Sequence, residues 1–144
     1  YAEKTWNRCR EANTGNITWF EKGMVDQQEF DDCLDAAHFV WIPSVVETTI
    51  CGPIPETYGI TKSSGNIFDI IKHAIPFIYP KTLIVPEVLK GSGISYGNIG
   101  EIAEALGYYT ANTDAYKTLT NAAGKASQQY TINNLRMIHA PLFD

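Results

Sequence analysis

The sequence predicts an all-α fold, a compact bundle of about five to seven short helices. Apolar residues recur at three- and four-residue spacing in at least four segments, which is the pattern of amphipathic helices. Strand signals are weak, because the β-branched run 82–88, which could form a strand, contains Pro86. We therefore expect less than about a tenth of the residues to lie in strands.

Capping residues and prolines set the expected helix limits. Asp26 can cap the longest apolar stripe, and Pro43 ends or kinks that helix. Thr61 or Ser63 can cap the next helix, which Pro76 terminates. The expected helices span residues 3–12, 26–41, 61–75, 80–89, 99–106, 112–123 and 128–138.

The length of 144 residues fits a single helical domain over residues 1–144. The chain begins with Tyr1 and has no basic or strongly apolar leader, as expected of a mature protein whose signal peptide has been removed. If a signal peptide has been removed, we expect the protein to be periplasmic or secreted. The formal net charge of −5 argues against nucleic acid as a partner, and no apolar run is long enough to cross a membrane.

Three cysteines are present, and none has the spacing of a zinc or haem site. Cys9 shares a predicted helix face with Trp6, and Cys33 lies on the next apolar stripe, so a Cys9–Cys33 disulfide is predicted. A Cys33–Cys51 bridge is its main competitor. In the predicted pairing Cys51 is an unpaired thiol or forms an intermolecular bond.

Other motifs give no catalytic or cofactor site. The glycine-rich segment 91–100 lacks the phosphate-loop spacing and the Walker lysine, so a loop between two helices is expected. His38, His73 and His139 fall on separate predicted elements, where only tertiary convergence could form a triad or a metal site. We expect no cofactor, no metal and no enzymatic activity. Asn16 begins a glycosylation sequon.

An acidic stretch is the candidate partner site. Between residues 23 and 60 there are seven acidic residues and no Lys or Arg. Asp31, Asp32 and Asp35 fall largely opposite the apolar stripe of their helix and lie beyond its first turn. They are the predicted contacts for a protein partner with a basic surface.

Residues 9–89 resemble the Rap/Tai-like periplasmic immunity proteins of type VI secretion. The likeness lies in a Cys-bearing first helix, a Cys that opens the helix CLDAAHFV, and a third Cys in the loop ICGPIPE. The chain lacks the family's fourth Cys. The resemblance implies a small helical protein that binds and neutralises a toxin enzyme from a neighbouring cell.

The leading functional hypothesis is therefore a non-enzymatic extracytoplasmic binding protein, such as an immunity or inhibitor protein. Three alternatives stay open. The chain could be a small extrinsic subunit of a larger complex, a helical carrier of an apolar ligand, or an enzyme with a dispersed site. An enclosed apolar cavity would favour the carrier, and convergent titratable groups in a cleft would favour the enzyme.

Overall fold

The computed structural model describes residues 7–8, 10–12, 15, 20 and 25–142. The chain divides into two compact units, residues 1–30 and 31–144, and each is described by itself. In the first unit, residues 7–8 and 10–12 are helical, and helix α2 (Gln27–Asp35) begins there. The Asp26 side chain accepts a hydrogen bond from the Gln28 N–H at 2.9 Å, so it caps α2 as predicted. The single-domain assignment stays a prediction.

The fold is mixed α/β, so the all-α prediction is wrong. Of the described residues, 55% are helical and 16% lie in strands, which form two small sheets. The strands were not predicted from the sequence because each is only two to four residues long. A short apolar run of that length shows neither the alternation of a half-buried strand nor the repeat of a helix.

The central sheet is parallel and consists of β1 (Val40–Trp41), β4 (Phe77–Pro80) and β5 (Gly93–Tyr96), in the order β1-β4-β5. Val40 pairs with Phe77, and Phe77 pairs with Gly93. Phe77 and Ile78 are almost completely buried, as expected for the middle strand of a parallel sheet covered on both faces.

The glycine-rich segment 91–100 contains β5, so the prediction of a simple loop there is wrong. Gly93 lies beside two aromatic rings of β4. A Cβ atom built on Gly93 would come within 2.7 Å of both the Phe77 and the Tyr79 ring. A glycine is therefore needed here for close packing against β4, and no phosphate-loop role is required to explain it.

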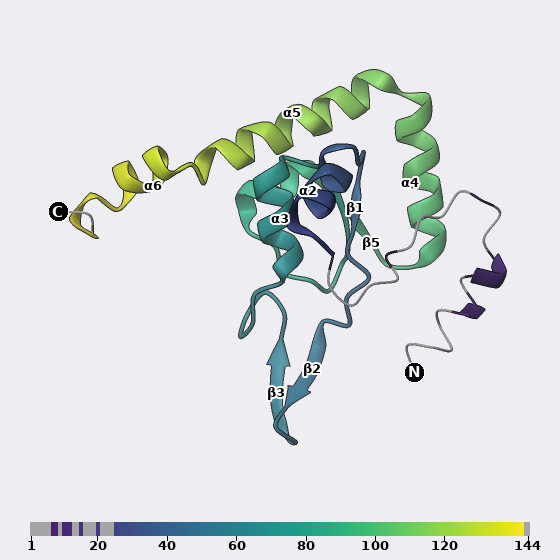
Figure 1. Cartoon of the computed structure of the whole chain (residues 1–144), viewed down its shortest axis with the longest axis horizontal. Coiled ribbons are helices and arrows are strands. Elements are labelled where there is room, and N and C mark those ends of the chain that lie inside the picture. Colours follow the sequence, from purple (N-terminus) through teal and green to yellow (C-terminus); the bar gives the residue numbers. More distant parts are fainter. Residues whose placement is uncertain (1–6, 9, 13–14, 16–19, 21–24, 143–144) are drawn as a thin grey trace. The chain divides into compact units, whose positions relative to one another are not determined.

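The second sheet is an antiparallel hairpin of β2 (Glu47–Ile50) and β3 (Ile54–Thr57). It extends away from the helices of the second unit in Figure 1. Cys51 and Gly52 both have positive φ at its tip, 48° and 91°, which lets the chain reverse over three residues. The predicted rigid loop at Cys51 is thus the turn of a hairpin.

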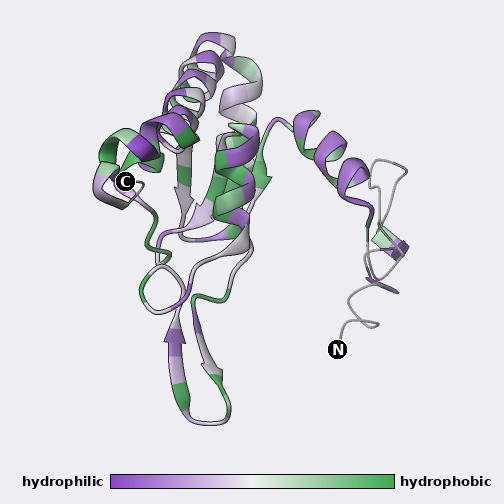
Figure 2. Cartoon of the chain, turned by 60° about the vertical axis from the view of Figure 1, so that its left-hand side comes forward, coloured by the Kyte–Doolittle hydropathy of each residue, from purple (hydrophilic) through white to green (hydrophobic). Residues whose placement is uncertain are grey.

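The remaining elements are helices; those up to residue 129 lie around the parallel sheet, and those after residue 131 extend away from it (Figure 1). They are α3 (Gly65–His73), the 3₁₀ helix η1 (Glu87–Ser92), α4 (Ile99–Ala111), α5 (Thr113–Gln129), α6 (Ile132–Ile138) and the 3₁₀ helix η2 (Ala140–Leu142). Helix α5 packs on η1, α3 and α4. The main core joins the sheet to these helices through Ile42, Ile70, Phe77, Leu89 and Ala126. Figure 2 shows hydrophobic residues on the strands and on part of α3.

Two predicted helices are shorter or displaced. The helix expected over 26–41 ends at Asp35, because the apolar run Val40–Trp41 pairs with β4 instead. The helix expected over 80–89 is replaced by an irregular segment and by η1, which starts after Pro86. Pro86 lacks an N–H and restricts the residue before it, so it favours a helix start over a helix interior.

Cys33 and Cys51 are free and exposed thiols in the structure. Cys9, Asn16 and Tyr1 lie outside the described residues, so the Cys9–Cys33 disulfide, the glycosylation sequon and the processing of the N-terminus stay predictions. Of the helices in the described parts of the chain, none is both long and apolar enough to cross a membrane.

Candidate functional site

The start of helix α3 lies at the carboxyl edge of the parallel sheet. The chain leaves β1, forms the hairpin and then α3, and enters β4 only four residues after α3 ends. Because β1 and β4 run parallel, α3 must return against the strand direction, and its N-terminus reaches the edge where the strands end. In open parallel α/β sheets this edge is where ligands bind.

A groove of about 460 Å³ opens at this position. Three segments form its walls: the turn before α3, the first two turns of α3, and the chain after β4, with Tyr130 from the end of α5. We call it the α3 groove. It is lined by Gly59, Ile60, Thr61, Lys62, Ser63, Ser64, Ile67, Phe68, Ile71, Leu83, Ile84, Val85, Pro86 and Tyr130.

The polar centre of the α3 groove is the N-terminus of α3. Ser64 occupies the N-cap position with extended backbone, but its side chain makes no capping hydrogen bond. Ser64 is only 7% exposed, but among the described residues the one enclosed side-chain oxygen without a hydrogen bond is Thr48 Oγ1, so the Ser64 hydroxyl is open to the groove that it lines. The N–H groups of the first turn of a helix have no acceptor within the helix. In α3 the Ile67 N–H donates to the Ser64 carbonyl at 3.1 Å, and Ser64 adds to the groove a hydroxyl that does not cap the helix.

Helix α4, which also begins at this edge directly after β5, is capped from within. The Asn98 side chain accepts from the Glu101 N–H at 3.3 Å. The Glu101 carboxylate accepts from the Gly97 N–H at 2.9 Å and from Lys81 Nζ at 3.0 Å. These contacts hold the pKa of Glu101 below its ordinary value, the Gly97 N–H having the largest effect. A carboxylate thus already occupies the start of α4, whereas the start of α3 is open.

A tight turn over residues 57–62 forms one wall of the α3 groove. The Thr57 N–H donates to Thr61 Oγ1 at 2.8 Å, and the Gly59 N–H donates to the Lys62 carbonyl at 2.8 Å. Gly59 has φ +88° and faces the Ile84 carbonyl so closely that a Cβ would lie 2.2 Å from that oxygen. The backbone on both sides of the groove is therefore fixed in place.

Lys62 is the charged residue of the groove lining. Its Nζ lies 3.1 Å from Glu56 Oε2 on β3 and 5.2 Å from the centroid of the Tyr58 ring. The hydrogen bond to Glu56, and then the attraction of that carboxylate, raise the pKa of Lys62 above its ordinary value. The ammonium is thus held at the rim of the groove in its charged form.

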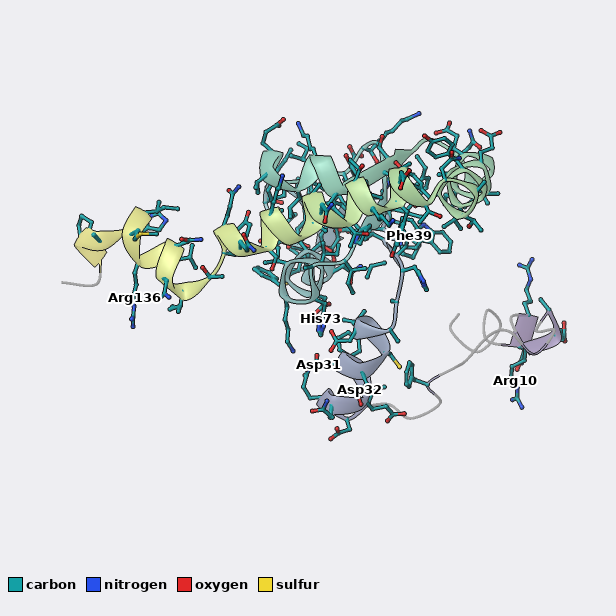
Figure 3. All side chains as sticks on the ribbon, turned by 90° about the horizontal axis from the view of Figure 1, so that it is seen from above. Arg10, Asp31, Asp32, Phe39, His73 and Arg136 are labelled. Atoms are coloured by element: carbon teal, nitrogen blue, oxygen red, sulfur yellow. The ribbon has the colours of Figure 1, made fainter. Side chains whose placement is uncertain are left out.

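Two of the three predicted partner-binding residues make ion pairs within the second unit. Asp31 lies 2.6 Å from Lys72 Nζ and 3.1 Å from His73 Nε2, and Asp35 lies 2.6 Å from His73 Nδ1. Figure 3 shows Asp31 and His73 side by side. Asp32 is exposed and does not share these contacts. Lys72 reduces the negative charge that was expected on this helix from the lack of nearby basic residues in the sequence.

The three histidines remain apart. His38 lies next to Tyr116, whose hydroxyl donates to the His38 carbonyl at 3.3 Å, and His139 follows α6. Across the described ranges, no three His, Cys, Asp or Glu residues are arranged to hold a metal ion. The sequence analysis named Thr61 or Ser63 as the cap of this helix, but Ser64 occupies the N-cap position, and the role of these residues in a groove was missed. The run Lys62-Ser-Ser-Gly65 directly before an amphipathic helix was the signal that could have found them.

Comparison of the chain with protein-family models, with characterised proteins and with solved structures finds no match.

Proposed function

We propose that this domain binds a phosphorylated small molecule in the α3 groove, with a phosphate group at the N-terminus of α3. The observation that carries the proposal is Ser64, a residue only 7% exposed that lines the groove at the N-cap of α3 while its hydroxyl makes no capping hydrogen bond. Backbone N–H groups and the helix dipole at such a start favour a bound anion.

The charge of the groove supports an anionic ligand. The protein has a net charge of −5, yet the lining residues of the groove include Lys62 and no carboxylate. Thr61 and Ser63 add hydroxyl groups next to Ser64. Hydroxyls, backbone N–H groups and an ammonium together are the donors that a phosphate group accepts.

The rest of the groove is apolar and supports a ligand with a flat or apolar body. Ile60, Phe68 and Ile84 are each more than half exposed around it. Their exposure in the absence of a ligand is unfavourable, and a nucleoside or another ring system would cover them. Nucleotides are the first class to test, because parallel α/β sheets bind them at the carboxyl edge of their strands.

Calorimetric titration of the whole chain tests the proposal. The ligands are nucleoside mono- and diphosphates, sugar phosphates, inorganic phosphate and the unphosphorylated nucleosides. We expect at least one phosphorylated compound to bind with Kd between about 1 μM and 1 mM. Ser64→Ala should weaken that binding about 10- to 150-fold, the loss of one hydrogen bond to a charged group.

Ser92→Ala is the matched control. Ser92 is also buried, but its hydroxyl donates to the Leu89 carbonyl at 2.9 Å and it does not line the groove. Ser92→Ala should leave the Kd unchanged. If no phosphorylated compound binds, or if both serine variants change the Kd by the same factor, the proposal fails.

The sequence-based hypothesis of a non-enzymatic immunity or inhibitor protein stays a prediction, as does a periplasmic or secreted location. Co-purification with a secreted enzyme, and loss of that enzyme's activity, would test it. A partner that docks on the acidic helix must displace or accommodate the contacts of Asp31 and Asp35 with Lys72 and His73.

A further inference from the structure

We infer that Lys62 is the cation that contacts the ligand's phosphate group, and that Glu56 holds this lysine at the rim while the groove is empty. This inference rests on the proposed function and deepens it. When a phosphorylated ligand binds, the Lys62 ammonium leaves the Glu56 carboxylate and contacts the phosphate group. This contact makes the groove selective for phosphorylated over unphosphorylated forms of the same ligand.

The position of Lys62 supports a direct contact. It stands two residues before Ser64, in the turn that leads into α3, and both residues line the groove. The turn is anchored by the Gly59 N–H to Lys62 carbonyl bond and by the close approach of Gly59 to Ile84. The backbone of Lys62 is therefore fixed, while its four-carbon side chain can swing between the rim and the groove.

The Glu56–Lys62 pair is suited to such an exchange. The Lys62 side chain is 40% exposed and the Glu56 side chain is 16% exposed, so the pair lies at the surface. A solvent-exposed ion pair adds little net stability, and a phosphate carries more charge than a carboxylate and offers more acceptor oxygens. Glu56 lies outside the groove lining and is thus placed to hold the lysine without blocking the ligand.

The chain offers a matched pair elsewhere. Lys90 and Glu87 on η1 form a comparable exposed ion pair, and the Glu87 carboxylate raises the pKa of Lys90 as Glu56 does for Lys62. Neither residue lines the α3 groove. Variants of this second pair therefore report the effect of losing a surface ion pair alone.

Titrations should use the diphosphates of adenosine, guanosine and uridine and the three nucleosides themselves. For the diphosphate that binds best, we expect Lys62→Met to raise the Kd about tenfold or more, the loss of one charge-assisted contact. The Kd of the corresponding nucleoside should change less than about twofold, because only the phosphate contact is removed. Lys62→Met should also flatten the dependence of Kd on salt concentration.

Three further variants complete the experiment. Lys62→Arg should keep most of the affinity, since it retains the charge. Glu56→Gln should lower the Kd of the diphosphate a few-fold, because Lys62 no longer has to leave a carboxylate. Lys90→Met should have no effect on either ligand.

The outcomes separate this inference from the proposed function. If a diphosphate binds and Ser64→Ala weakens it while Lys62→Met does not, the groove binds phosphate and the role of Lys62 is wrong. An equal loss of nucleoside and diphosphate binding in Lys62→Met also overturns the inference, since it indicates a structural role. If none of the diphosphates binds the wild-type chain, this inference is overturned for the nucleotide class. If the other phosphorylated compounds also fail to bind, the proposed function is overturned with it.

Discussion

Gly59 packs against the backbone carbonyl of Ile84 across the α3 groove. A Cβ atom at position 59 would lie 2.2 Å from the Ile84 oxygen, and the φ of Gly59 is +88°. Two independent requirements therefore coincide at one residue, a left-handed backbone and the absence of a side chain. This contact joins the turn before α3 to the segment after β4 and so fixes the width of the groove.

Gly59→Ala should destabilise the protein by about 2–4 kcal/mol, the sum of backbone strain and a backbone clash. The clash cannot be relieved by rotating a side chain, because the opposing atom is a carbonyl oxygen. Chemical denaturation measures the free energy of unfolding. The same variant should also weaken ligand binding in the groove, because the two walls must move apart.

Gly107→Ala is the matched control. Gly107 lies inside α4, and a Cβ there would meet no atom within 4 Å. Alanine is the better helix former by about 1 kcal/mol, so this variant should gain stability. If Gly59→Ala and Gly107→Ala shift the free energy of unfolding in the same direction, the close packing of Gly59 on Ile84 is not required.

His73 should anchor the second half of α2 to α3. Its side chain is 5% exposed and lies between Asp31 and Asp35, within 3.1 Å and 2.6 Å of their carboxylates. His73→Ala removes both contacts and leaves two carboxylates without this partner, at a cost of about 1–3 kcal/mol. Urea denaturation gives the free energy, and hydrogen exchange of the amides of residues 31–35 should become faster.

Lys72→Met provides the comparison for His73. Lys72 contacts Asp31 at 2.6 Å, but its side chain is 53% exposed. An exposed ion pair contributes less than about 1 kcal/mol, so this variant should be close to the wild type in stability. A larger loss for Lys72→Met than for His73→Ala would contradict the anchoring role.

Most α-helices after residue 60 could be predicted from the sequence, the helix expected over residues 80–89 being the exception, whereas the parallel sheet could not. The helix predicted over residues 61–75 contains α3, and the helices predicted over 99–106 and 112–123 coincide with the first parts of α4 and α5. The strands Val40–Trp41 and Phe77–Pro80 are apolar on both faces and too short to show a period. Their pairing is a tertiary contact between segments almost forty residues apart.

The candidate site could not be predicted from the sequence, for a related reason. The α3 groove depends on where α3 begins relative to the strand ends, and an all-helical assignment has no such edge. The contacts of Asp31 with Lys72 and His73 likewise join residues about forty positions apart. The acidic segment was read from its own neighbours in sequence, and these include no basic residue.

Ala74→Gly should stabilise the protein. Ala74 ends α3 in the left-handed conformation, with φ 53° and ψ 42°, and its N–H donates to the Ile70 carbonyl. Glycine is preferred at such a position, because a left-handed backbone costs alanine about 1 kcal/mol of conformational energy. We expect a gain of about 0.5–1 kcal/mol in the free energy of unfolding. The same change at Ala105, inside α4, should instead cost about 1 kcal/mol.

Glu101 should make the stability of the protein depend on acid pH. Its pKa is lowered from the ordinary value of 4.5, chiefly by the Gly97 N–H and then by Lys81. The folded state therefore binds a proton at this carboxyl less readily than the unfolded state does. The stabilisation from Glu101 is fully present well above pH 4.5 and is lost as the pH falls through the folded pKa, which lies below that value.

Glu101→Gln removes this titration while keeping the size of the side chain. The variant should be less stable than the wild type at pH 7, because the charged contacts with Gly97 and Lys81 are gone. Thermal unfolding of both proteins between pH 7 and pH 3 should show their difference in Tm shrinking as the pH falls below 4.5 towards the lower folded-state pKa of Glu101, where this carboxyl becomes neutral. Glu104→Gln, also on α4 but outside the cap, should show no such convergence. A wild-type advantage that stays constant down to pH 3 would mean that the cap does not depend on the charge of Glu101.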